Sequence, residues 1–97
     1  MLINRRTFVT KHGRSQDATE FLKNGANHLD WVPPLRVSTS HFGSLRKVQL
    51  ELEFESLADY EKFWTAFEEA PESQAVLEKW WECIEAGGTT NEIWKIA

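Results

Sequence analysis

Length, composition and charge set the first limits on this chain. It has 97 residues, with 15 Asp and Glu against 11 Lys and Arg, a formal net charge of −4 and a single cysteine, Cys83. This length predicts one domain, residues 1–97, whose core forms without disulfides. The negative charge disfavours a general nucleic-acid-binding protein, so no nucleic-acid partner is expected. The first residues lack the apolar run of a signal peptide or membrane span, which predicts a cytoplasmic protein with no membrane partner.

The charges are divided unevenly along the sequence. Residues 1–48 hold eight Lys and Arg against three Asp and Glu, whereas residues 49–97 hold three against twelve. The basic half opens with RRTFVTKHGRSQD (residues 5–17), a run that could serve a phosphate, a nucleic acid or an active-site base. Because both halves also carry regularly spaced apolar residues, we expect the opposite charges to meet within the fold.

The first half of the chain predicts a strand, a helix and a hairpin. Residues 2–10 are rich in β-branched and aromatic types, which are typical of a strand. Ser15 is expected to cap a helix with an apolar stripe that continues to Leu29. After two prolines, residues 35–42 and 45–55 form a predicted hairpin around a tight turn at Gly43–Ser44.

The second half predicts two helices and a closing strand. Ser56 followed by Asp59 resembles a capping box, and the helix that it begins stops near Pro71. A second apolar stripe starts at Val76 and runs to Gly87–Gly88, which can supply a left-handed cap. Residues 90–97 are expected to form the last strand.

This order of elements, βαββαβ with an extra C-terminal helix, is that of a ferredoxin-like α+β domain with an antiparallel sheet. Its strand order is 4-1-3-2, which places the first strand beside the third. The basic residues of the first strand would then neighbour acidic residues of the third, and such pairs stabilise a sheet modestly. The basic set is Arg5, Arg6 and Lys11, and the acidic set is Glu51, Glu53 and Glu55.

The hairpin predicts a register in which paired residue numbers sum to 87. Arg36 then faces Glu51, and Ser38 faces Gln49, so one face of the hairpin is polar and the other is apolar. The apolar face suits cover by helices. Two interpretations of the polar face remain open: it lies in water, or it meets a second sheet.

Three short segments resemble NIPSNAP-type proteins. Residues 6–13, RTFVTKHG, resemble the R-T-Y-T-L-K-P-G opening of that family, with Phe8 at the tyrosine and His12 at the proline. Residues 55–60 resemble its strand-to-helix junction, and residues 70–72 its D-P-E step. The resemblance implies a dimeric α/β barrel, in which two ferredoxin-like protomers pack sheet against sheet as a homodimer and their polar faces line a shared cavity. It supplies no invariant catalytic residues.

Catalytic and metal motifs are sparse. His12, His28 and His41 lack metal-ligand spacing, so no metal site is expected. His41 beside the turn is the best candidate for a general base, although an exposed turn histidine is the plainer interpretation. Cys83, within the last predicted helix, is expected to be a buried, inert thiol. No glycine-rich phosphate loop opens a helix, and no cofactor is expected.

Five tryptophans are the most unusual feature of the composition. Core packing explains most of them, and an interface or a ligand wall is the alternative. Trp80 and Trp81 cannot both face inward, so one of the two is expected to be partly exposed or to pack on another chain.

Two functional classes remain open. In the first, an enzyme similar to the cofactor-independent monooxygenases that act on aromatic substrates, or to isomerases, Arg36 would hold an anion and Glu51 would accept a proton. In the second, a non-catalytic ligand-binding or assembly module, the polar face is filled by ion pairs. The predicted Arg36–Glu51 pair favours the second class. The candidate cavity for a small-molecule ligand comprises Phe8, Arg36, His41, Gln49, Glu51 and Trp94.

Overall fold

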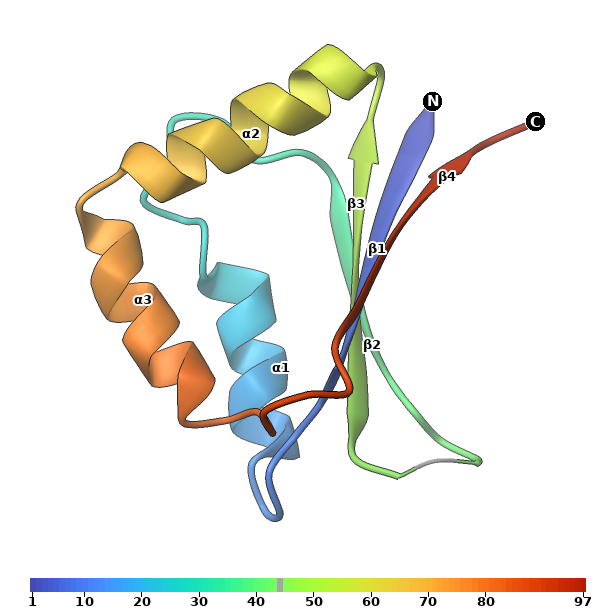
Figure 1. Cartoon of the computed structure of the whole chain (residues 1–97), viewed down its shortest axis with the longest axis vertical. Helices are drawn as coiled ribbons and strands as arrows, with labels where there is room; N and C mark the ends of the chain where they lie inside the picture. The colour runs from blue at the N-terminus through green and yellow to red at the C-terminus, as the bar shows by residue number, and fades with distance from the viewer. Residues whose placement is uncertain (44) are drawn as a thin grey trace.

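Within residues 1–43 and 45–97, which the computed structural model describes, the chain forms four strands and three helices (Figure 1). They follow in the order β1 (Leu2–Val9), α1 (Ser15–Asn24), β2 (Leu35–Thr39), β3 (Lys47–Phe54), α2 (Leu57–Glu69), α3 (Glu72–Trp81) and β4 (Thr90–Lys95). This is the βαββαβ order with one extra helix, α3, before the last strand. The predicted ferredoxin-like α+β class is confirmed.

The four strands form one antiparallel sheet with β1 in its interior. The order is β2-β3-β1-β4, so β1 is hydrogen-bonded to β3 on one side and to β4 on the other, as predicted. All three helices cover the same side of this sheet and leave the other side uncovered (Figure 1). We call the covered side the helix face and the uncovered side the open face.

The predicted register of the β2–β3 hairpin is confirmed. Arg36 pairs with Glu51 and Ser38 pairs with Gln49. The strands end sooner than expected. Among the described residues, the last backbone hydrogen bond between them joins the Ser40 amide to the Lys47 carbonyl at 3.0 Å. Arg46 then adopts a positive φ of 65° in the connection. The expected turn residue Ser44 lies outside the described residues.

Alternation along β1 sends neighbouring side chains to opposite faces. Asn4, Arg6 and Phe8 lie on the helix face, whereas Arg5 shares the open face with its register partner Glu51. The expectation that the whole basic set matches the acidic strand is therefore wrong for Arg6, which faces the helices. It is also wrong for Lys11, which lies beyond the end of β1.

The core lies between the helix face and the helices, in two adjoining clusters. One joins β1, α1 and the end of α3, and the other joins β3 to α2 and to the chain that leads into β2. The buried members of the first are Phe8, Ala18, Val48, Trp80 and Cys83, and those of the second are Leu50, Leu52, Phe54 and Phe63. Because β3 contributes alternate residues to both clusters, it ties the two halves of the core together.

Two helix ends differ from the sequence-based expectation. Arg14, not Ser15, occupies the N-cap of α1 and makes no side-chain cap, and the helix stops at Asn24 because Gly25, a poor helix former, follows. The cap of α2 is as predicted: the Asp59 amide donates a hydrogen bond to Ser56 Oγ at 3.2 Å. The helix ends at Glu69, just before Pro71.

The helix α3 ends at Trp81, earlier than the apolar stripe predicts. The chain leaves the helix because residues 83–85 pair with the end of β1: the Lys11 amide donates to the Cys83 carbonyl at 2.8 Å, and the Glu85 amide donates to the Val9 carbonyl at 2.8 Å. Cys83 is buried, as expected, but it follows the helix. Gly87 and Gly88, both with positive φ, form the turn into β4 and do not cap α3.

Two phenylalanines of opposite exposure test the position of the core. Phe54 is 2% exposed and Phe42 is 87% exposed. We expect Phe54→Ala to lower the free energy of unfolding by about 3–5 kcal/mol, because it opens a cavity in the core. Phe42→Ala is the control and should change it by less than about 0.5 kcal/mol. Urea unfolding at a fixed protein concentration measures both, and equal losses would contradict the described packing.

Candidate functional site

The six residues of the expected cavity do not lie on one surface. Arg36, Gln49, Glu51 and Trp94 share the open face, as their register positions require. Phe8 lies on the other side of the sheet, in the core. The exposed His41 is in the connection after β2, beside the ring of Phe42 at 4.6 Å. The structure therefore brings four of the six together and separates Phe8 and His41 from them.

The centre of the open face is an ion-paired cluster. Glu51, which is buried, accepts from Arg5 Nη2 at 3.1 Å through Oε2 and from Arg36 Nε at 3.2 Å through Oε1. Beside this cluster, Gln49 Nε2 donates to Thr7 Oγ1 at 3.3 Å. These polar groups satisfy one another. The open face thus carries the mutual ion pairs that are expected of a module instead of the unpaired groups of a catalytic cavity.

One end of the open face is apolar. Trp94 is 53% exposed, and Ile96 and Met1 are also exposed on the same face at the ends of β4 and β1. The guanidinium of Arg5 lies 5.8 Å from the centre of the Trp94 ring. Because aromatic residues are enriched at protein interfaces, this end of the open face is a candidate interaction surface.

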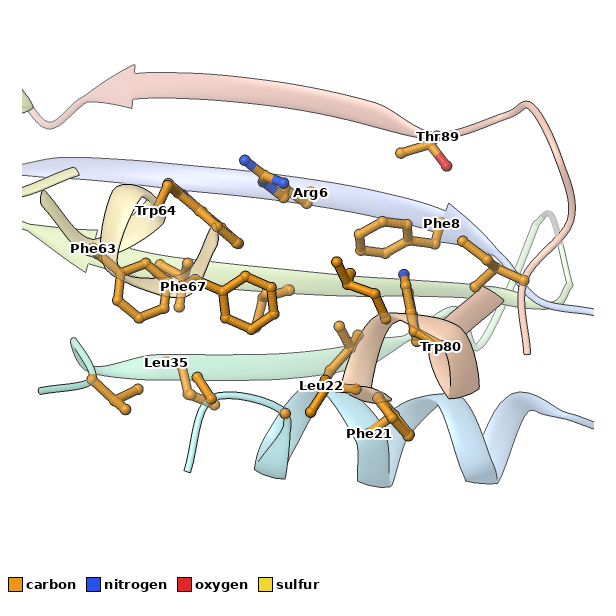
Figure 2. Close-up of a pocket in the computed structure, with 18 of the residues that line it drawn as sticks. Arg6, Phe8, Phe21, Leu22, Leu35, Phe63, Trp64, Phe67, Trp80 and Thr89 are labelled. Atoms are coloured by element: carbon orange, nitrogen blue, oxygen red, sulfur yellow. The ribbon is translucent and has the colours of Figure 1, made fainter. Parts of the chain in front are cut away.

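A pocket of about 360 Å³ lies on the helix face, between the sheet and all three helices. In Figure 2, Phe63, Trp64 and Phe67 of α2 line one part of it, and Phe21 and Leu22 of α1 line another, while Arg6 and Phe8 reach it from β1. Its walls are almost wholly aliphatic or aromatic. Phe8 and Trp80 meet edge to face there, with ring centres 4.8 Å apart. The volume lies within the range of small-molecule sites.

Arg6 is the one charged residue among the described residues that line this pocket. Its guanidinium carbon lies 3.7 Å from the centre of the Trp64 ring, close enough for a cation–π interaction. Its Nε is buried and has no hydrogen-bond partner among the described residues. Arg6 is a site residue that was not predicted from the sequence, although strict alternation along residues 2–10 would have separated it from Arg5.

Trp64 is held by a buried asparagine. Its indole N–H donates to Asn4 Oδ1 at 3.2 Å. The amide of Asn4 in turn donates to Asn91 Oδ1 at 2.7 Å and to the Glu92 carbonyl at 3.1 Å. Asn4 is only 1% exposed. Because the Trp64 indole N–H and the side-chain amide of Asn4 both have hydrogen-bond partners, this network fixes the ring against which Arg6 packs.

The described part of the pocket wall carries no acid–base group. Of the described residues that line it, none is Asp, Glu, His or Cys. Cys83 borders a separate, more polar cleft of about 470 Å³ between α1 and the end of α3. Arg14 Nη2 lies 3.5 Å from the Cys83 sulfur there, and this hydrogen bond raises the pKa of Arg14 above its ordinary value.

The described residues hold neither a cluster of metal-ligating side chains nor a membrane-spanning helix. Nowhere in residues 1–43 and 45–97 do three or more His, Cys, Asp or Glu side chains gather as metal ligands would. The described helices are also too short and too polar for any of them to span a bilayer.

Comparison with known proteins shows a shared fold. A NIPSNAP domain protein of unknown function from Burkholderia xenovorans superposes with a TM-score of 0.85 at 17% identity, covering 100% of this chain and 95% of that one. A candidate antibiotic biosynthesis monooxygenase from Deinococcus radiodurans gives a TM-score of 0.70 at 9% identity, covering 100% and 93%. A dimeric protein of ferredoxin-like fold and unknown function from Bacteroides fragilis gives 0.64 at 13% identity, covering 98% and 96%.

No family model and no curated protein matches the chain. At the level of the fold, the resemblance to NIPSNAP-type domains is confirmed by the solved structures.

The Asn4–Trp64 hydrogen bond is testable. Trp64→Phe keeps an aromatic ring but removes the indole N–H, which leaves the buried Asn4 oxygen without this donor. We expect a loss of about 1–3 kcal/mol in the free energy of unfolding. Trp81→Phe is the matched control: Trp81 is 53% exposed and should cost less than about 0.5 kcal/mol. Equal costs in urea unfolding would show that the hydrogen bond does not form.

Proposed function

We propose that this chain is a NIPSNAP-like protein that pairs through its open face as a dimeric α/β barrel and binds a small apolar molecule in the pocket of each protomer. The observation that carries the proposal is the difference between the two faces of the sheet. The helix face encloses an aromatic pocket of about 360 Å³, while the open face is uncovered and carries an exposed apolar end. Contact with a second chain would remove this exposed apolar end from water, which is favourable.

The charges of the open face suit contact with a second copy. Three cationic and three anionic side chains of the strands lie on this face, so its formal charge is zero. They are Arg5, Arg36, Lys47, Glu51, Glu53 and Glu92. A face of zero net charge does not repel its own copy through its net charge, and in a two-fold contact any cation–anion pair across the interface occurs twice. The Bacteroides fragilis protein of ferredoxin-like fold is dimeric, which supports the proposal that this chain also pairs.

The pocket favours binding over catalysis. General acid–base catalysis needs a group that exchanges a proton with the substrate, and the described lining offers neither a carboxylate nor an imidazole. The guanidinium of Arg6 offers N–H donors and no acceptor, so its role would be to bind an acceptor group of the ligand. A ligand-binding module is therefore the first proposal for this site.

A cofactor-independent monooxygenase or isomerase is the second candidate function. It is supported by the fold shared with the candidate monooxygenase of Deinococcus radiodurans and by the aromatic walls of the pocket. In such an enzyme the pocket would orient an aromatic substrate, and the substrate itself would have to supply the reactive proton and electrons. Conversion of a bound aromatic molecule under air, followed by mass spectrometry, separates this candidate from simple binding.

The proposed dimer is tested by two tryptophans of equal exposure. Trp94 on the open face and Trp81 on α3 are each 53% exposed. Light scattering should give twice the chain mass of 11.3 kDa. Trp94→Glu should yield a monomer because it places a charge in the contact, whereas Trp81→Glu should leave the dimer intact. A wild-type monomer at micromolar concentration, or dissociation by Trp81→Glu alone, would contradict pairing through the open face.

Filling the pocket tests the binding proposal. Ala26 lines the pocket, and Ala75 is an exposed residue of α3 that does not. The neutral fluorescent probe N-phenyl-1-naphthylamine should bind once per chain. Ala26→Trp should weaken its binding at least about tenfold, since the new ring occupies the space that the probe needs. Ala75→Trp should not change the affinity. Equal effects of the two variants would place the probe elsewhere.

A further inference from the structure

Arg6 differs from every other arginine of the chain in its charge partners. All five arginines lie within the described residues. Arg5 and Arg36 pair with Glu51, Arg14 pairs with Asp17, and Arg46 pairs with Glu85. Arg6 alone makes no ion pair with a described carboxylate, and it is the arginine that lines the apolar pocket.

The surroundings of Arg6 leave its charge without an anion. One face of the guanidinium rests on the Trp64 ring, and its buried Nε donates to no described acceptor. The other described residues of the pocket wall are uncharged. Placing a cation against apolar walls is unfavourable unless a counter-charge or hydrogen-bond acceptors accompany it. The cation–π contact offsets part of this cost, and the N–H groups remain available to an acceptor.

We propose that the natural ligand of the pocket is a small apolar carboxylic acid, bound as its carboxylate by Arg6. This inference rests on the proposed binding function of the pocket. The carboxylate accepts hydrogen bonds from the guanidinium, and the apolar part of the ligand packs on Phe8, Trp80 and neighbouring rings. Planar guanidinium and planar carboxylate match in geometry, so the pair can form two parallel hydrogen bonds.

The composition of the pocket wall disfavours cationic ligands and phosphates. A cationic ligand would be repelled by Arg6, because the described lining holds no carboxylate to offset the repulsion. A phosphate carries close to two negative charges at neutral pH, and the described lining supplies a single cation and little else that is polar. A monoanion with a large apolar part fits both the one charge and the aromatic walls.

Asn4 and Trp64 act as positioning residues for this anion site. The Asn4–Trp64 hydrogen bond holds the indole ring, and the ring holds the guanidinium from one face. The remaining edge of Arg6 is then oriented before the ligand arrives, which limits the entropy lost on binding.

Matched ligands of equal shape test the inference. The probe N-phenyl-1-naphthylamine is displaced from the wild-type protein by 2-naphthoate or by the neutral 2-naphthamide. The acid should displace it at concentrations about ten- to a hundredfold lower than the amide, the range expected of charge-assisted hydrogen bonds. Arg6→Met keeps the length and apolar stem of the side chain, and it should make the two ligands equal. Lys62→Met removes an exposed cation of α2 outside the pocket and should preserve the preference.

The outcomes separate this inference from the binding proposal. If the probe binds and Ala26→Trp blocks it, yet the acid and the amide displace it equally from the wild type, the carboxylate inference is wrong while the pocket remains a binding site. If the probe does not bind the wild type, both proposals fail. Should Arg6→Met not fold, Arg6→Lys decides: it keeps the charge but loses the planar fork, so the preference should shrink. An undiminished preference in Arg6→Lys and a lost preference in Lys62→Met would each overturn the role of Arg6.

Discussion

The alternation of side chains along β1 is the constraint on which the rest of this structure depends. β1 lies inside the sheet, hydrogen-bonded on both edges, so each of its residues must serve one face or the other. The adjacent residues Arg5 and Arg6 therefore lie on opposite faces of the sheet. Arg5 joins an ion-paired cluster on the open face, and Arg6 enters an aromatic pocket on the helix face. A shift of one residue in register would exchange these assignments and would place Asn4 and Phe8 in water.

Charged side chains have different partners on the two faces of the sheet. On the open face, the buried carboxylate of Glu51 accepts hydrogen bonds from two guanidinium groups that are themselves partly or largely exposed, so solvent limits the stability that the pairs contribute. On the helix face, Arg6 has an aromatic ring in place of a carboxylate. The ion pairs of the first arrangement are complete within the chain, which suits the proposed contact with a second copy. The second arrangement has no anion among the described residues, which suits the proposed reversible binding of an anionic ligand.

Pairing and topology could be predicted from the sequence because they depend on local patterns. The sum of 87 for paired residues in the hairpin follows from the expected two-residue turn, and the alternation of residues 35–39 and 47–54 agrees with it. The register holds although the strands end before that turn. The pocket could not be predicted, since it depends on how far α1 and α3 stand from the sheet. The same holds for the end of α3, where the pairing of residues 83–85 with β1 overrides the helical stripe. The prediction that Arg6 lies beside the acidic residues of β3 was wrong, because charges were matched strand by strand without separating the two faces of β1.

The side-chain Nε–H resonances of Arg5 and Arg6 in a ¹⁵N-labelled sample test the two-faced account most directly. Each resonance can be assigned from the corresponding Arg→Lys variant. Addition of 2-naphthoate should shift the Arg6 resonance and leave that of Arg5 in place, whereas dilution that dissociates the proposed dimer should shift the Arg5 resonance and leave that of Arg6 in place. A ligand that shifts Arg5 alone, or dilution that shifts Arg6 alone, would contradict the assignment of one arginine to each face.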